Sequence, residues 1–160
     1  MQVLNKREDS YHNIQSIFVE IDLEDVLVFH PLPSFQLSAE GVDVPVDESN
    51  LIFKAYQLIR SKTEKVDTEY AIHLIKQIPI GGGLGGGSSN AAATLNALNN
   101  LWELNFSLQE LEKMGVELGA DVSFFIKLLN SENNNMVTIY KIPHPIITNF
   151  GMAQYLASIG

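Results

Sequence analysis

The chain has 160 residues, of which 46% are apolar and 18% are charged, proportions that are ordinary for one globular domain with a sizeable core. Its formal net charge of −9 argues against a nucleic-acid partner, and the absence of cysteine excludes disulfides, zinc thiolate sites and thiol catalysis. No apolar run approaches the roughly 18 residues of a membrane helix, and the first residues do not resemble a signal peptide. These features predict a cytoplasmic protein that binds neither membranes nor nucleic acid.

The first part of the chain predicts strands and loops. Three segments have the β-branched, aromatic or alternating content of strands: residues 14–22, 26–29 and 35–38. Polar residues 5–10 predict a loop, and residues 23–25 separate the first two strands. Residues 39–49 hold the Gly, Pro, Asp and Ser that are typical of a loop.

A helix and a further strand are predicted next. Asn50 is a candidate helix cap, because apolar residues follow it at helical spacing through Ile59. Residues 61–68 are charged and predicted to be exposed. Residues 70–76 return to strand character and lead into a glycine-rich segment.

The glycine-rich segment carries the functional prediction. Six of the eleven glycines fall within residues 81–87. Such a run disfavours a strand or helix interior, but its backbone N–H groups can curl around an anion. Ser-Ser-Asn at 88–90 and the alanines after it predict a capped helix start. A glycine loop that leads into a helix N-terminus is the arrangement that holds phosphate, so the segment predicts nucleotide binding.

Three other interpretations of this segment fit less well. A Walker-type loop needs Gly-Lys-Ser/Thr, and no lysine lies in this loop. A dinucleotide fingerprint matches at Gly81, Gly83 and Gly86, but its acidic partner would be Glu103, at the end of the same helix. A flexible linker would not lie between an apolar strand and an alanine-rich helix.

Two helices are predicted after the loop. The first runs from about Ser88 to Trp102, with one apolar face made of Ala91, Leu95, Leu98 and Trp102. The second begins at Ser107 with a capping box to Glu110 and ends at Gly119. Its predicted buried side consists of Leu108, Leu111, Met114 and Leu118. Strands and helices without regular βαβ alternation predict an α+β fold.

The motif Pro-x-x-x-Gly-Leu-Gly, at Pro79, Gly83, Leu84 and Gly85, resembles the ATP-binding motif of the GHMP kinases. The resemblance covers roughly residues 3–127. It implies the α+β nucleotide-binding N-terminal domain of that family over residues 1–127, incomplete at its start, with a divergent tail over residues 128–160 and the second domain absent. The implied ATP-binding residues are Asn50, Lys76, Pro79, Gly81, Gly82, Gly83, Leu84, Gly85, Gly86, Gly87, Ser88, Ser89 and Asn90.

The resemblance also implies Mg²⁺ as a cofactor, held mainly by the ATP phosphates together with the hydroxyl of Ser88 or Ser89. No separate metal site is predicted. Asn50 would approach the adenine, and it could cap the helix at the same time. Lys76 would lie near the base, and the alternative is a surface lysine at a strand end.

Two further segments extend the resemblance. Residues 7–12 resemble the family's Arg-x-Asp-Gly-Tyr-His segment, with Ser10 in place of Gly, and this implies that Tyr11 and His12 hold the substrate. Without the resemblance these two would be a half-buried aromatic and an exposed histidine. Gly-Ala-Asp-Val ending at Val122 resembles the segment that supplies the catalytic aspartate, which implies that Asp121 accepts or orients the hydroxyl proton. The alternative is a loop aspartate.

The implied activity is ATP-dependent phosphorylation of the 2-hydroxyl of a methylerythritol linked to cytidine diphosphate, in non-mevalonate isoprenoid synthesis. The family's Ala-Lys-x-Asn-Leu segment, with its active-site lysine, has no counterpart here. An inactive nucleotide-binding fragment therefore remains an alternative, as do a homoserine or mevalonate kinase and a dinucleotide oxidoreductase. His30, His73 and His144 are interpreted as structural.

Overall fold

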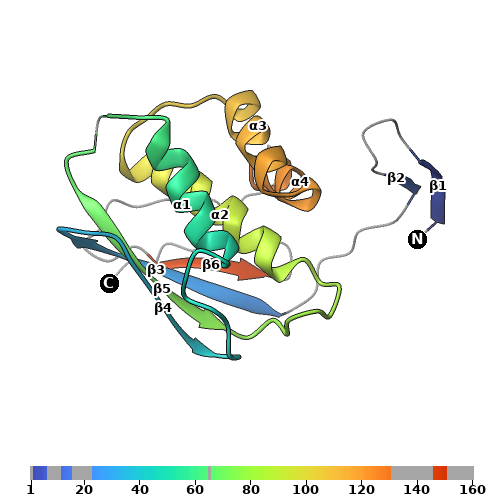
Figure 1. The fold of residues 1–160 in the computed structure, drawn as a ribbon, viewed down its shortest axis with the longest axis horizontal. Helices are drawn as coiled ribbons and strands as arrows, with labels where there is room; N and C mark the ends of the chain where they lie inside the picture. The colour runs from blue at the N-terminus through green and yellow to red at the C-terminus, as the bar shows by residue number, and fades with distance from the viewer. Residues whose placement is uncertain (1, 7–11, 16–22, 65, 131–145, 151–160) are drawn as a thin grey trace.

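A four-stranded mixed sheet with helices packed against one face forms the main body of the chain (Figure 1). The computed structural model describes residues 2–6, 12–15, 23–64, 66–130 and 146–150. The strand order is β4 (Gln36–Gly41), β5 (Glu69–Lys76), β3 (Glu24–Leu32) and β6 (Ile146–Phe150). β3 is antiparallel to both β5 and β6, whereas β4 is parallel to β5.

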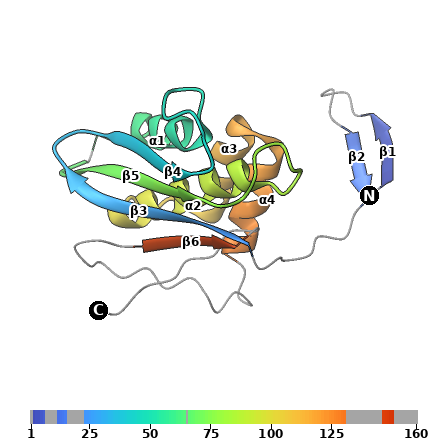
Figure 2. The same cartoon turned by 90° about the horizontal axis from the view of Figure 1, so that it is seen from below.

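Two further strands, β1 (Gln2–Lys6) and β2 (His12–Gln15), pair antiparallel in a sheet of their own. Figure 2 shows this pair apart from the main sheet.

The helices are α1 (Leu51–Ser61), α2 (Gly86–Leu101), α3 (Leu108–Leu118) and α4 (Ala120–Leu129). α2 lies centrally and contacts the other three helices as well as β3 and β6. Its small alanines allow this close packing, and most of its residues are buried on every side. The middle of α2 is therefore buried between the sheet and the other helices.

The core lies between the sheet and the helices. Every second residue of β5 from Tyr70 to Lys76 is buried, and in β3 the same holds from Asp25 to Phe29. This alternation follows from the pleat, which sends successive side chains to opposite faces. Two of the inward-facing residues, Asp25 and Lys76, are charged and lie where β3 begins and β5 ends. The end of the core beside the glycine loop is therefore polar.

The structure confirms the α+β class, and it corrects several boundaries. Residues 39–41 belong to β4 and not to the predicted loop, and Asp25 lies within β3 and not between two strands. Residues 16–22, predicted as a strand, lie outside the described residues. α2 begins at Gly86, two residues before the predicted start.

The predictions for the later helices were right in part. The Ser107–Glu110 capping box is present, and α3 ends at Gly119 as expected. Leu108, predicted to be buried, is 39% exposed. Gly115, which was not predicted to be buried, packs against α4. The apolar run from Ala120 forms α4, which continues past residue 127 to the buried Leu129. Residues 146–150, within the predicted divergent tail, add a strand to the main sheet.

Candidate functional site

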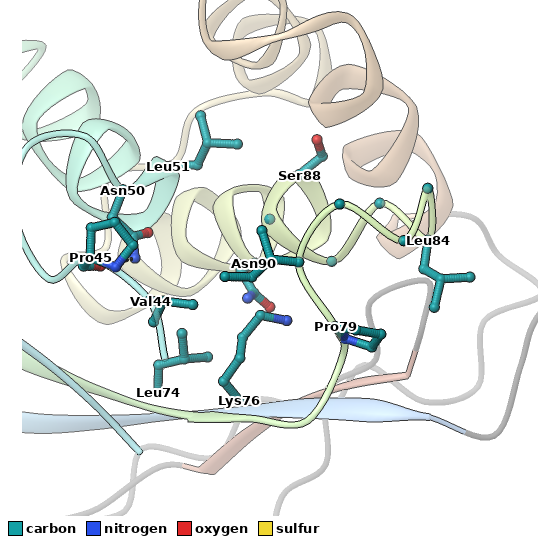
Figure 3. Close-up of a pocket in the computed structure, with 17 residues that line it drawn as sticks. Val44, Pro45, Asn50, Leu51, Leu74, Lys76, Pro79, Leu84, Ser88 and Asn90 are labelled. Carbon is teal, nitrogen blue, oxygen red and sulfur yellow. Dashed lines mark hydrogen bonds between the residues drawn. The ribbon is translucent and has the colours of Figure 1, made fainter. Parts of the chain in front are cut away.

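A pocket of about 330 Å³ lies where β5 ends and α2 begins (Figure 3). One wall is apolar and comes from the segment before α1, from α1 itself and from β5: Val44, Pro45, Leu51 and Leu74. The other wall is the glycine loop with the first residues of α2. Lys76, Asn50 and Asn90 supply polar groups between the two walls (Figure 3). The pocket therefore combines an apolar end with a loop rich in backbone N–H groups.

The glycine loop has a left-handed backbone at three positions, since φ is +73° at Gly81, +69° at Gly83 and +71° at Gly85. Residues with a Cβ rarely adopt these angles. Gly85 is the N-cap of α2, and a Cβ there would lie 2.7 Å from the ring of Phe125 in α4. The loop is thus pressed against α4 at its C-terminal end.

Gly86 is required for a different reason, which is space. Its φ is not positive, but a Cβ would lie 2.8 Å from the side chain of Ile78 and 3.1 Å from Lys76 Nζ. Because Gly86 has no side chain, the start of α2 comes close to the end of β5. The ammonium group of Lys76 consequently lies beside the helix N-terminus.

The N-terminus of α2 offers a positive field to the pocket. The first backbone N–H groups of a helix have no partner within the helix, and the helix dipole adds a partial positive charge there. No acidic residue lies in the first turn of α2. Nothing on this turn opposes an anion, so it is suited to a phosphate group.

The serines after the loop do not cap the helix, contrary to prediction. Ser88 and Ser89 lie inside α2, and the N-cap Gly85 makes no side-chain hydrogen bond. Ser89 is fully buried, and its hydroxyl donates to the carbonyl of Gly86 at 3.0 Å. Ser88 is half-buried and lines the pocket. Of the two predicted phosphate-binding serines, only Ser88 faces the pocket.

A buried ion pair lies beneath the loop. Lys76 Nζ donates to Asp25 Oδ2 at 2.6 Å and to the carbonyl of Ile78, and the side chains of Lys76 and Asp25 are 5% and 0% exposed. Asp25 Oδ2 also accepts from Asn90 Nδ2 at 3.0 Å. Lys76 is thus not the surface lysine of the alternative interpretation. Sequence reasoning missed Asp25, because only the fold brings it to Lys76.

Asn50 caps α1 and also lines the pocket. Its Oδ1 accepts from the backbone N–H of Ile52 at 2.9 Å, which caps α1, and its Nδ2 donates to the carbonyl of Pro45 at 2.7 Å. The residue also lines the pocket beside the apolar wall. The cap and the link to Pro45 fix the orientation of the Asn50 amide.

Residues 50–127 match the family described as GHMP kinases N terminal domain. Residues 50–127 belong to the N-terminal domain of the GHMP kinases. Among curated relatives, 4-diphosphocytidyl-2-C-methyl-D-erythritol kinases from Chloroherpeton thalassium, Acinetobacter baylyi and Syntrophus aciditrophicus are 40%, 46% and 47% identical to it. Each match covers 79% of this chain and 44%, 46% and 45% of the relative.

A crystal structure of 4-(cytidine 5'-diphospho)-2C-methyl-D-erythritol kinase is similar in fold. Its TM-score is 0.51 at 28% sequence identity, and the match covers 97% of this chain and 50% of that one. The chain therefore spans about half the length of the solved structure and less than half the length of the curated relatives it matches.

The candidate catalytic residue of the GHMP kinase domain, Asp121, does not line the pocket. It is exposed in the first turn of α4 and not in a loop. One turn further along the same helix, Phe125 packs against Gly85. The carboxylate thus lies on the helix that supports the C-terminal end of the glycine loop.

The candidate substrate residues are described only in part. Tyr11 lies outside the described residues, and His12 lies in β2, with its backbone alone described. His73, interpreted as structural, pairs its Nδ1 with the Ser38 hydroxyl at 2.8 Å on the sheet.

Neither a preformed metal cluster nor a membrane span occurs in the part of the chain that the structure describes. No three His, Asp or Glu side chains within it are grouped to hold a metal ion. None of its helices is both long and apolar enough to cross a bilayer.

Proposed function

We propose that this chain is the nucleotide-binding part of a kinase that transfers the γ-phosphoryl group of ATP to the 2-hydroxyl of 4-diphosphocytidyl-2-C-methyl-D-erythritol. The main support is the pocket itself, in which a glycine loop and an unopposed helix N-terminus face an apolar wall. The names of the relatives give the acceptor. Non-mevalonate isoprenoid synthesis in the cytoplasm is the setting that the proposal implies.

ATP would bind with its phosphates at the glycine loop and its base at the apolar wall. The N–H groups of Gly86, Gly87 and Ser88 would donate to phosphate oxygens, helped by the helix dipole. The apolar side chains around Leu51 and Leu74 would contact the flat base, and the fixed Asn50 amide would meet its polar edge. An apolar pocket with a few oriented polar groups is the usual form of a small-molecule site.

Mg²⁺ fits this pocket as a companion of the phosphates. With no acidic cluster among the described residues, the phosphates would supply most of its oxygen ligands, and Ser88 is the serine whose hydroxyl could join them. When bound, the ion would neutralise phosphate charge.

Transfer would use Asp121 as the proton acceptor. The acceptor hydroxyl would give its proton to the Asp121 carboxylate as its oxygen forms the new bond to the γ-phosphorus. The bond from that phosphorus to the bridging oxygen would break, and ADP would leave with the electron pair. Tyr11 and His12 would hold the cytidine and diphosphate of the acceptor by stacking and hydrogen bonding.

A second candidate is a domain that binds nucleotide without turning it over. It is favoured by the position of Asp121 outside the pocket. Both candidates predict ATP binding, and they differ in turnover.

The first test is a calorimetric titration of the purified chain with MgATP and, separately, with NAD. The second is an assay of ADP release in the presence and in the absence of the cytidine-diphosphate acceptor. MgATP binding with acceptor-dependent ADP release supports the kinase. MgATP binding without release supports the nucleotide-binding domain. Preferential NAD binding, or no binding of either, contradicts both.

A further inference from the structure

We propose that Asp25 is a positioning residue that holds the phosphate loop in its nucleotide-binding shape. One carboxylate would fasten the chain both before and after the loop. The inference rests on the proposed ATP binding, but its structural part can be tested without nucleotide.

Each carboxylate oxygen of Asp25 accepts hydrogen bonds at a different end of the loop. Oδ1 accepts from the backbone N–H groups of Gln77 and Ile78, at 2.8 and 2.9 Å, where the chain leaves β5. Oδ2 accepts from Asn90 Nδ2 at 3.0 Å, in the first turns of α2, and from Lys76 Nζ at 2.6 Å. We call these four hydrogen bonds the loop clasp.

The tip of the loop makes little contact of its own. Gly81, Gly82 and Gly83 are exposed, and a Cβ built at Gly81 or Gly83 would meet no atom within 4 Å. Glycine has more backbone freedom to lose than any other residue. Because the tip has so few contacts, its conformation depends on how firmly its two ends are held.

Burial strengthens the hydrogen bonds of the loop clasp. Asp25 is 0% exposed, Asn90 is 2% exposed and Lys76 is 5% exposed, so water does not compete for the hydrogen bonds among these three side chains. Hydrogen bonds to an ionised group in such surroundings are stronger than neutral ones. The Asp25 carboxylate also balances the Lys76 ammonium beside Gly86, so that this cation stays in place under the loop.

Asp25→Asn would open one half of the clasp. The amide oxygen of asparagine can still accept from Gln77 and Ile78, but the amide nitrogen is a donor. It would face Lys76 Nζ and Asn90 Nδ2, which are donors too. The substitution therefore keeps the size of the side chain while it removes the link to α2.

The experiment compares Asp25→Asn with Ile59→Ala, a control that creates a cavity in the fully buried side of α1 without touching the loop. Both are studied at a temperature where circular dichroism shows them folded. For Asp25→Asn we expect the MgATP Kd to rise about tenfold or more, and amides 77–90 to exchange hydrogen faster than in the control. Ile59→Ala lowers stability but leaves the Kd unchanged.

A wild-type Kd in Asp25→Asn, or loop exchange equal to that of Ile59→Ala, overturns the proposal. If Asp25→Asn does not fold, the wild-type chain still decides: the Gln77 and Ile78 amides must be protected from exchange, and fast exchange at both overturns the clasp. Absence of MgATP binding by the wild type contradicts the proposed function instead, and the exchange measurement is unaffected by it.

Discussion

The glycines of the loop are not interchangeable. Gly85 needs its left-handed backbone, and Gly86 needs the space of a missing Cβ, whereas Gly82 needs neither. A Cβ at Gly82 would lie 3.6 Å from Pro79, an ordinary contact distance. The conformation of the loop therefore depends on particular positions and not on the number of glycines.

Gly86→Ala tests this distinction, with Gly82→Ala as the matched control. We expect Gly86→Ala to lower the free energy of unfolding by about 1–3 kcal/mol, because the new methyl group overlaps Ile78, and to weaken MgATP binding. Gly82→Ala should leave both nearly unchanged. Urea unfolding and calorimetric titration measure the two effects. Equal behaviour of the two variants would contradict the assignment.

Asp121→Asn tests the proposed proton acceptor. Because Asp121 is exposed and lines no wall of the pocket, the variant should fold normally and keep the MgATP Kd of the wild type. Its kcat should fall by about 10²–10⁴-fold, the usual contribution of a general base. Asp67→Asn, at another exposed position, is the control and should retain full turnover. Retained turnover in Asp121→Asn would exclude the catalytic role.

At the scale of the element, the start of α3 is held by a capping box. The Ser107 hydroxyl accepts from the Glu110 N–H, and the Glu110 carboxylate accepts from the backbone N–H and the hydroxyl of Ser107. The hydrogen bond from the Ser107 hydroxyl has the larger effect on the Glu110 pKa, and the one from the Ser107 backbone N–H adds to it. Together they hold this pKa below its ordinary value. A carboxyl group whose pKa is lowered in the folded state stabilises the fold at pH values above its ordinary pKa. This stabilisation is lost as the pH falls through the lower pKa of the folded state.

Ser107→Ala is therefore expected to cost about 1 kcal/mol of unfolding free energy at pH 7, the usual effect of losing an N-cap. The difference between wild type and variant should narrow as the pH is lowered from about 5 toward 3, because protonated Glu110 no longer supports the box. Urea unfolding at several pH values measures this difference. A constant difference would show that Glu110 is not linked to the cap.

At the scale of the whole molecule, α2 joins the core to the site. Its first turn borders the pocket, and its middle is buried among the sheet and the other helices. The single Trp102 directly follows α2 and donates from Nε1 to the carbonyl of Thr68 at 2.8 Å. Loss of packing under α2 should therefore be visible in Trp102 fluorescence.

Leu98→Ala removes a fully buried side chain from the middle of α2. We expect the free energy of unfolding to fall by about 2–5 kcal/mol, through lost burial and the cavity that remains. Trp102 fluorescence during urea unfolding measures this. Lys54→Ala, on the exposed side of α1, is the control and should stay within about 0.5 kcal/mol of wild type. A small effect of Leu98→Ala would mean that α2 is less tightly packed than the structure indicates.

What could be predicted from the sequence was local. The Asn50 cap, the Ser107–Glu110 box and the end of α3 at Gly119 depend on residues within a few positions of each other, and each was predicted correctly. The glycine loop before a helix was predicted for the same reason. The start of α2 was misplaced because Ser88 was the expected N-cap. The N-cap is instead Gly85, which has a left-handed backbone.

The sequence by itself determined the α+β class, the glycine loop before α2 and the family, because strand alternation, helical spacing and the loop motif all lie in short segments. Only the tertiary structure decided what lies beneath the loop. Asp25 and Lys76 are 51 positions apart, and Asp25 and Asn90 are 65 apart, so no local pattern links them. They meet because β3 pairs side by side with β5 and α2 packs against β3, which places one buried carboxylate between the two ends of the loop.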